Sequence, residues 1–201
     1  KRIFDGDAGP NTGGMGAYTP VPQIPEEAVQ QAISQVLKPT AKGMVAEKRP
    51  FQGILYAGLI QTATGPKVIE FNARFGDPET QVVLARLESP LSEIISSLLA
   101  KEQPTIVWNE LASVGVVVAA EGYPNQYKTN LPLPEMSGKT IYYAGVTRSE
   151  QALVSAGGRI FLAEATASTL EEARKKVYQT LDNYSFPGMY YRKDIGVKGL
   201  I

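Results

Sequence analysis

The chain has 201 residues, 43% of them hydrophobic, and its 20 basic and 20 acidic residues cancel, which leaves no electrostatic case for binding nucleic acid or a membrane surface. The absence of cysteine excludes disulfides and thiolate catalysis, and the absence of histidine removes histidine bases, Ser-His triads and most zinc sites. Because no run of about 18 apolar residues predicts a membrane span, we expect a cytoplasmic protein whose chemistry rests on carboxylates, Lys, Arg, Tyr and backbone groups.

The first feature along the chain is a glycine-rich segment over residues 5–18, Asp-Gly-Asp-Ala-Gly-Pro-Asn-Thr-Gly-Gly-Met-Gly-Ala-Tyr. Glycine costs backbone entropy and buries nothing, so we expect a loop here, not a packed helix or central strand. A loop of this kind can bring several backbone N–H groups close to an anion. An ordinary connecting loop is the alternative, because the segment matches neither common phosphate-binding pattern.

Helical periodicity follows a proline-punctuated linker over residues 20–25. Glu26 and Glu27 open a helix whose apolar residues are spaced for one buried face. Those apolar residues are Val29, Ile33, Val36 and Leu37. Pro39 should kink or split the helix, because proline lacks the backbone N–H that a helix interior needs.

An antiparallel hairpin is predicted next. Residues 53–60 read as a buried strand, and Thr64-Gly65-Pro66 turns the chain into a second strand over residues 68–72. Alternation along that strand puts Glu70 and Asn72 on one face, roughly 6.6 Å apart. Ile69 and Phe71 are expected to turn the other way into packing.

The face with Glu70 and Asn72 predicts a metal site. A carboxylate and an amide oxygen can both reach one hard cation, and Mg²⁺ usually takes one or two protein ligands and leaves the rest to water and phosphate. Arg74, which continues the same alternation, can brace a phosphoryl oxygen. An edge strand with polar residues on its solvent side is the alternative for this triplet.

The segment after the hairpin ends the strand and opens a helix. Gly76-Asp77-Pro78 breaks the strand, and Glu79 begins an apolar-periodic stretch. Ser89-Pro90 then starts a helix over residues 91–99, whose apolar stripe we interpret as packing.

A second unit is predicted from about residue 103. Strands are expected at residues 114–120, buried on both faces, and at 141–146 and 159–165. Residues 122–138 read as a loop, and Thr169 with Glu172 forms a capping box for a final helix. Gly157-Gly158 is interpreted as a tight turn, with a ligand loop as the alternative.

Two strings carry a family resemblance. Arg74-Phe75-Gly76-Asp77-Pro78-Glu79-Thr80-Gln81 resembles, without a gap, the signature of the phosphoribosylamine–glycine ligase family of ATP-grasp enzymes, and residues 5–18 resemble the substrate loop of that family. Tyr190-Tyr191-Arg192-Lys193-Asp194 resembles its closing segment. The Arg and Lys of that segment could meet a sugar phosphate or form surface salt bridges.

The resemblance implies an α+β fold in two parts. An ATP-grasp C-terminal subdomain with an antiparallel sheet and helices would occupy residues 1–101, and a small α+β C-terminal domain would occupy residues 102–201. The start at Lys1, just ahead of the glycine-rich segment, suggests a piece of a longer chain. We therefore expect the N-terminal and nucleotide-clasping lobes of the same protein as partners, and no turnover by these 201 residues alone.

The implied activity is ATP-dependent ligation of glycine to 5-phosphoribosylamine in purine synthesis, through a glycyl phosphate. Glu70 and Asn72 would hold Mg²⁺ or Mn²⁺ against ATP, and the catalytic residues would be Arg74, Asp77 and Glu79. The residues implied to bind the substrates are Asp5, Asp7, Asn11, Thr12, Gly13, Gly14, Met15, Gly16, Gly76 and Pro78.

Two alternatives and one departure from the family pattern remain. The alternatives are an ATP-grasp ligase for another carboxylate and amine, and a non-catalytic ATP-grasp-derived module of a multifunctional purine enzyme. The departure concerns a third metal-binding carboxylate, which many ATP-grasp enzymes carry on the strand before the Glu-x-Asn strand. Residues 56–59 of this chain, Tyr-Ala-Gly-Leu, contain no acid.

Overall fold

The chain separates into two compact units. The structure, a computed structural model, describes residues 1–150 and 152–201. The first unit comprises Lys1–Pro20, Asp77–Leu87 and Trp108–Ile201, and the second comprises Val21–Gly76 and Glu88–Val107. Within the described residues, no helix is both long enough and apolar enough to span a bilayer.

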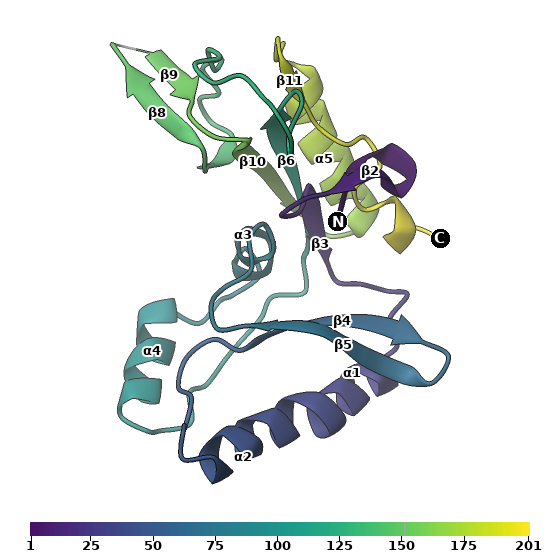
Figure 1. Cartoon of the computed structure of the whole chain (residues 1–201), viewed down its shortest axis with the longest axis vertical. Helices are drawn as coiled ribbons and strands as arrows, with labels where there is room; N and C mark the ends of the chain where they lie inside the picture. The colour runs from purple at the N-terminus through teal and green to yellow at the C-terminus, as the bar shows by residue number, and fades with distance from the viewer. Residues whose placement is uncertain (151) are drawn as a thin grey trace. The chain divides into compact units, whose positions relative to one another are not determined.

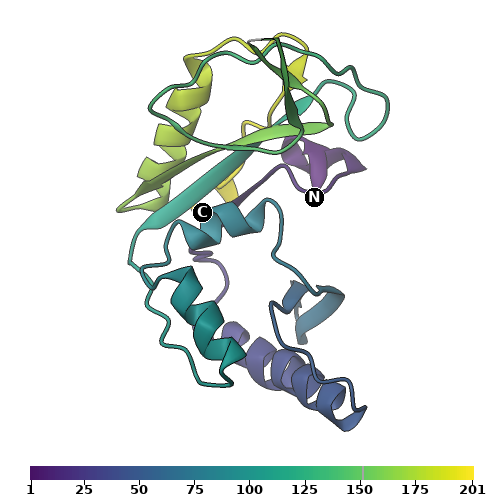
Figure 2. The same cartoon turned by 90° about the vertical axis from the view of Figure 1, so that its left-hand side faces the viewer.

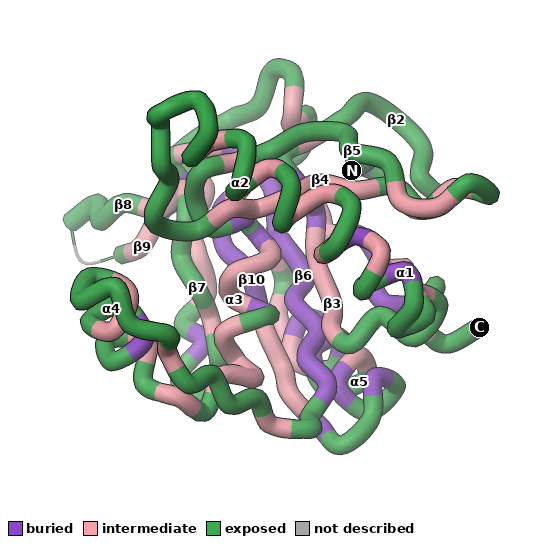
Figure 3. The backbone as a smooth tube through the Cα atoms, turned by 90° about the horizontal axis from the view of Figure 1, so that it is seen from below, coloured by how far each residue is buried: buried purple, intermediate pink, exposed green. Residues whose placement is uncertain are grey.

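An antiparallel sheet forms the centre of the first unit. Strand β6 (Ala112–Ala120) is buried along its whole length (Figure 3), as the unbroken apolar run predicted. One edge of β6 pairs with β10 (Arg159–Ala167), and β10 pairs in turn with β7 (Thr140–Tyr143). The other edge of β6 pairs with β3 (Gly16–Thr19) and then with β11 (Met189–Tyr190).

Helix α5 (Leu170–Asp182) packs along this sheet (Figure 2). The Thr169 half of the predicted capping box is confirmed, because Oγ1 of Thr169 accepts a hydrogen bond from the Glu172 N–H at 3.2 Å. Val114, Val116 and Val118 belong to the same buried cluster as the inward residues of α5. Because side chains alternate along a strand, Gly115 faces the other way, toward Val82 of the short helix α3 (Glu79–Leu84).

Gly115 is needed for this close packing. A Cβ at this position would lie 2.7 Å from Cγ2 of Val82 and 2.9 Å from Cδ1 of Leu162. We expect Gly115→Ala to lower the free energy of unfolding by about 1–2 kcal/mol, because the sheet and helix must separate to admit a methyl group. Urea unfolding should show this loss. Gly43→Ala is the matched control, since a Cβ at this helical glycine meets no atom within 4 Å and alanine favours a helix. An equal loss in both variants would contradict the packing argument.

Two hairpins complete the first unit. One consists of β1 (Arg2–Phe4) and β2 (Ala8–Asn11), joined by the 3₁₀ turn η1 (Asp5–Asp7). The other consists of β8 (Val146–Ser149) and β9 (Ala152–Ser155), and a second 3₁₀ turn, η3 (Val197–Gly199), lies near the C-terminus.

Two predictions about this unit are wrong. The glycine-rich segment is not only a loop, because β2 and β3 lie within it. Gly16 permits the pairing of β3 with β6, since a Cβ there would lie 2.6 Å from the Gly115 carbonyl oxygen. The strand expected at residues 141–146 ends at Tyr143, and Val146 already belongs to the next hairpin. Gly145 lies between them, where a Cβ would be 2.6 Å from the Arg159 carbonyl oxygen.

The second unit contains the predicted hairpin of β4 (Tyr56–Thr62) and β5 (Gly65–Asn72). A helical run of α1 (Glu26–Ala32), the π-helical η2 (Ile33–Leu37) and α2 (Lys38–Ala46) lies beside the hairpin (Figure 1). Helix α4 (Leu91–Leu99) completes the unit. Pro39 does interrupt the α-helical hydrogen bonding, but the chain stays helical because the Lys38 N–H bonds to the Ile33 carbonyl in a π turn.

Burial in this unit is shallower than the sequence predicted. Strand β4 begins at Tyr56 instead of residue 53 and is only half-buried. The small residues Ala28 and Ala32 form the buried line of α1, whereas Val29 is 40% exposed. In α4 the predicted packing stripe holds for Ile94 but not for the exposed Ile95 and Leu99. A two-stranded hairpin with a few helices offers too little surface to bury every apolar face.

Candidate functional site

The predicted metal ligands lie on strand β5 of the second unit. Glu70 pairs with Gly58 and Asn72 pairs with Tyr56 in an unbroken register, so both ligands project from one face of the hairpin. A Cβ on Gly58 would lie 3.2 Å from Cγ of Glu70. Glycine opposite Glu70 therefore leaves room for the carboxylate, and the face presents the oxygen donors that a hard cation prefers.

The paired stretch of β4, residues 56–59, supplies no acidic side chain to this face. Among the residues that the structure describes, no group of three or more His, Cys, Asp or Glu side chains is arranged to hold a metal ion. Glu70 and Asn72 fit a cation that takes two protein ligands and completes its shell with phosphate and water, as Mg²⁺ does.

Two predictions about the flanking residues are wrong. Ile69 is 66% exposed and Phe71 is 42% exposed, so neither is packed inward. The register also shifts beside Glu70, which leaves Ile69 without a direct partner in β4. Arg74 does not continue the alternation, because β5 ends at Asn72. Nη1 of Arg74 donates instead to the Phe75 carbonyl at 2.7 Å.

In the first unit, Arg159 joins the glycine-rich segment to the signature string. Its Nη1 donates to the Asp77 carbonyl at 2.7 Å and to the Gly14 carbonyl at 3.4 Å, and its Nη2 contacts Oδ2 of Asp77 at 3.2 Å. Gly14 has a φ of +124°, and a Cβ there would lie 2.6 Å from Cδ of Pro78. The structure thus brings Gly13-Gly14 and Asp77-Pro78, predicted from separate strings, against one guanidinium group.

Backbone N–H groups of the glycine-rich segment already have partners. The Gly14 N–H donates to Oγ1 of Thr12 at 3.0 Å, and that hydroxyl donates to the Lys1 carbonyl at 2.7 Å. The Gly13 N–H donates to the Tyr123 hydroxyl at 3.1 Å. Met15 is 2% exposed and packs with Ile3 in a buried cluster. The N–H groups of Gly13 and Gly14 are therefore engaged within the fold, and Met15 contributes to packing.

The remaining predicted residues are spread over both units. Asn11 is exposed in β2 and pairs with Arg2. Glu79, at the start of α3, lies 3.9 Å from the Lys1 ammonium group. Pro78 is buried in the first unit, and Gly76 is buried in the second.

Asp5 and Asp7 contact the C-terminal segment. The Lys193 N–H donates to Oδ1 of Asp5 at 2.7 Å, and Nη2 of Arg192 contacts Oδ1 of Asp7 at 3.0 Å. Arg192 is 7% exposed and also donates to both carboxylate oxygens of Asp194 at 2.7 Å. Of the two sequence interpretations for Arg192, the ion pair is the one present; the arginine is buried, whereas the side chain of Asp7 remains 47% exposed.

Hydrogen bonds to the carboxylates of Asp7 and Asp194 contribute to the pH dependence of stability. Lys198 and then Arg192 lower the pKa of Asp7, and Arg192 lowers the pKa of Asp194. A lowered folded-state pKa stabilises the fold above the unfolded value of about 3.9, and this contribution is lost as pH falls through the folded pKa.

We therefore expect the free energy of unfolding to decrease as the pH falls from about 5 to below 3. Asp194→Asn should make that decrease shallower, because a carboxylate with a lowered pKa is replaced by a group that does not titrate. Urea unfolding at a series of pH values measures both slopes. Identical slopes in the two proteins would exclude Asp194 as a source of the pH dependence.

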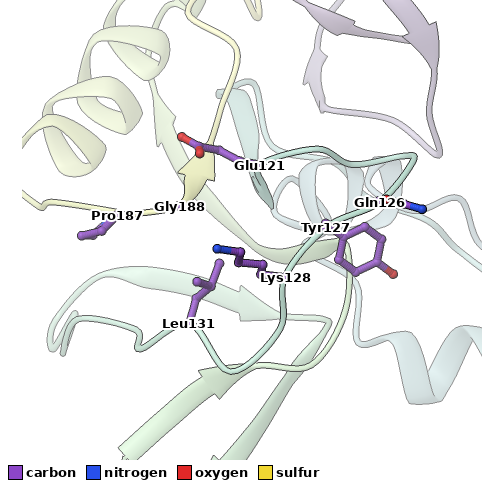
Figure 4. A pocket seen from close by; sticks show the side chains of 7 residues that line it. All are labelled: Glu121, Gln126, Tyr127, Lys128, Leu131, Pro187 and Gly188. Atoms are coloured by element: carbon purple, nitrogen blue, oxygen red, sulfur yellow. The ribbon is translucent and has the colours of Figure 1, made fainter.

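A separate cavity of about 650 Å³ lies in the first unit (Figure 4). Its lining comes from the loop after β6 and the turn before β11. The lining residues are Glu121, Gln126, Tyr127, Lys128, Leu131, Pro187 and Gly188. None of them is among the residues that the sequence predicted to act on substrate.

Comparisons with known proteins agree with the two strings. A family model described as "Phosphoribosylglycinamide synthetase, ATP-grasp (A) domain" matches residues 1–80, and one described as "Phosphoribosylglycinamide synthetase, C domain" matches residues 113–198. The chain belongs to the phosphoribosylamine–glycine ligase family. The predicted domain division between residues 101 and 102 stays a prediction.

Individual relatives support the same family. Phosphoribosylamine–glycine ligases of Halalkalibacterium halodurans and Lactococcus lactis are each 53% identical over the whole chain. The crystal structure of the ligase of Thermotoga maritima covers 97% of the chain at 34% identity with a TM-score of 0.89, which confirms the predicted α+β ATP-grasp fold. The chain spans about half the length of these relatives, at 48% to 49%.

More distant structures share only the fold. The biotin carboxylase domain of the Hydrogenobacter thermophilus 2-oxoglutarate carboxylase is 17% identical, with a TM-score of 0.62 over 88% of the chain. Membership of the ATP-grasp family implies the use of ATP and a divalent metal ion.

Sequence reasoning missed two residues that contact the glycine-rich segment, Arg159 and Tyr123. Arg159 stood inside a predicted strand, and Tyr123 stood in a region read as a loop. The sequence did contain one hint for Arg159. This residue begins β10 directly after Gly157-Gly158, a pair for which a ligand loop was the alternative interpretation. Nothing in the sequence paired either residue with Gly13 or Asp77, which lie 46 or more positions away.

Proposed function

We propose that this chain is part of an enzyme that ligates glycine to 5-phosphoribosylamine, with cleavage of ATP to ADP and phosphate. The product is glycinamide ribonucleotide, and the setting is purine biosynthesis. The observation that carries the proposal is the 53% identity, over the whole chain, to proteins named phosphoribosylamine–glycine ligase. A cytoplasmic location stays a prediction.

The reaction divides into two transfers. An oxygen of the glycine carboxylate attacks the γ-phosphorus of ATP, and the bond to ADP breaks. The amine of phosphoribosylamine then attacks the carbonyl carbon of glycyl phosphate, phosphate leaves with the former carboxylate oxygen, and the amine loses a proton. Both steps depend mainly on positioning and on stabilising charge, which suits a chain without histidine.

The chain's own residues have distinct roles in this proposal. Arg74 stabilises the transferring phosphoryl group, and Asp77 and Glu79 position the substrate amines or the glycine-rich segment. The contact of Asp77 with Arg159 supports the second of these roles for Asp77. Asp5, Asp7 and the backbone between Asn11 and Gly16 hold the amine substrates.

Glu70 and Asn72 are proposed to hold Mg²⁺ or Mn²⁺. The bound ion would neutralise phosphate charge during phosphoryl transfer. Their shared face on β5 and the space left by Gly58 support this assignment. The rest of the longer protein is proposed to supply the nucleotide-clasping lobe, so the 201 residues alone should not turn over.

ADP release by the full-length protein tests the proposal. The assay contains Mg²⁺ and ATP, with glycine and phosphoribosylamine added singly and together. Release that requires both substrates supports the ligase. Release with a different carboxylate and amine would identify a sister ligase, and no release under any combination would favour a non-catalytic module.

A further inference from the structure

Tyr123 contacts the glycine-rich segment from another part of the fold. Its hydroxyl accepts the Gly13 N–H at 3.1 Å across 110 positions of sequence. The Tyr123 N–H donates to the Ala120 carbonyl at 3.1 Å, so the residue sits in a turn directly after the central strand β6. The contact therefore links Gly13 to the most buried strand of the first unit.

The ring of Tyr123 is held in place by neighbours. A Cβ at Gly158 would lie 2.2 Å from Cδ2 of Tyr123, so no side chain fits between that backbone and the ring. The ring of Tyr127 meets it edge to face, with centroids 6.1 Å apart. The Ala120 N–H donates to the Gly158 carbonyl at 2.8 Å, which fixes the glycine in turn.

This arrangement accounts for the glycine at residue 158, which the sequence left between a tight turn and a ligand loop. A glycine is needed at residue 158 because the Tyr123 ring occupies the space that any side chain would take. Arg159, the next residue, holds Gly14 and Asp77. Two consecutive residues thus support neighbouring positions of the glycine-rich segment. Gly158 supports Gly13 through the Tyr123 side chain, and Arg159 contacts Gly14 directly.

We propose that Tyr123 is a positioning residue for substrate binding: its hydroxyl holds Gly13 and so keeps residues 12–16 in the conformation that takes the amine substrates. The inference rests on the proposed function for the role of that segment. The hydrogen bond itself is independent of the function and can be tested without it.

Tyr123→Phe removes the hydroxyl and keeps the ring that packs on Gly158. In the 201-residue chain, amide hydrogen exchange followed by NMR should speed up about fivefold at Gly13, the loss expected for one hydrogen bond. The Val118 amide in β6 should not change. Tyr143→Phe, which removes an exposed hydroxyl from β7, is the matched control and should leave Gly13 unaffected. Unchanged exchange at Gly13 in Tyr123→Phe would overturn the inference.

Kinetics of the full-length enzyme separate a positioning role from a merely structural one. Tyr123→Phe should raise the KM for glycine or phosphoribosylamine about three- to tenfold, with the KM for ATP and the melting temperature unchanged. Faster exchange at Gly13 with both amine-substrate KM values unchanged would overturn the positioning role. A wild-type enzyme without ligase activity would instead refute the proposed function. That result differs from an active enzyme whose KM values do not respond to Tyr123→Phe.

Discussion

Replacement of Glu70 by glutamine should lower the rate of ligation by the full-length enzyme about 100-fold or more. The substitution keeps the size of the side chain and removes its negative charge. Glu70 projects with Asn72 from one face of β5, opposite a glycine. The bound cation loses an anionic ligand in this variant, and the loss of one electrostatic contact to a transition state typically costs 10² to 10³ in rate.

The rate loss should come without a loss of structure. Glu93→Gln is the matched control, because Glu93 is exposed on helix α4 of the same unit. Steady-state ADP release and the melting temperature are measured for both variants. The assignment predicts equal melting temperatures and a large rate difference, and a Glu70→Gln enzyme as fast as Glu93→Gln would exclude Glu70 as a metal ligand.

Loss of the Arg192 guanidinium should produce the largest loss of stability. Arg192→Met should lower the free energy of unfolding of the first unit by about 2–4 kcal/mol, because it removes several charge-assisted hydrogen bonds made by a buried guanidinium group. Arg192 contacts Asp7 and Asp194, and its Nη1 also donates to the Arg2 carbonyl at 3.0 Å. The side chain therefore ties the first hairpin to the C-terminal segment.

The matched control for this change is Arg148→Met. Arg148 is exposed on β8 in the same unit, so its replacement should change stability by less than about 0.5 kcal/mol. Urea unfolding of the chain followed by far-UV circular dichroism measures both variants. Similar midpoints for the two would show that the contacts of the Arg192 guanidinium contribute no net stability.

Sequence patterns predicted the fold best where burial is complete. The run over residues 114–120 predicted a strand buried on both faces, and Thr169 with Glu172 predicted a helix start, because both signals are local. Residues 8–19 were predicted as a loop but contain β2 and β3. Glycine predicts a loop unless the strand that pairs with it is known. A glycine is needed at residue 16 because a Cβ there would clash with the carbonyl oxygen of Gly115, which lies 99 positions away in the sequence.

The candidate site likewise contains residues that local sequence signals predicted and residues that they did not. Alternation along one predicted strand singled out Glu70 and Asn72, and the signature string singled out Asp77, because both signals are local in the sequence. Arg159 and Tyr123 act through contacts with backbone groups far along the chain, and such contacts leave no pattern in one sequence. The exposure of Ile69 could not be read from alternation either, because alternation predicts which residues share a face but not whether that face is covered.

Transfer of oxygen from glycine tests the central claim most directly. The full-length enzyme is supplied with ATP, phosphoribosylamine and glycine labelled with ¹⁸O in both carboxylate oxygens, and the released phosphate is analysed by mass spectrometry. A glycyl phosphate requires that one labelled oxygen leave with phosphate while the other stays in the product amide. One ¹⁸O in each phosphate is therefore the predicted result. Unlabelled phosphate from an active enzyme would contradict it, because ATP would then be cleaved without activating the glycine carboxylate.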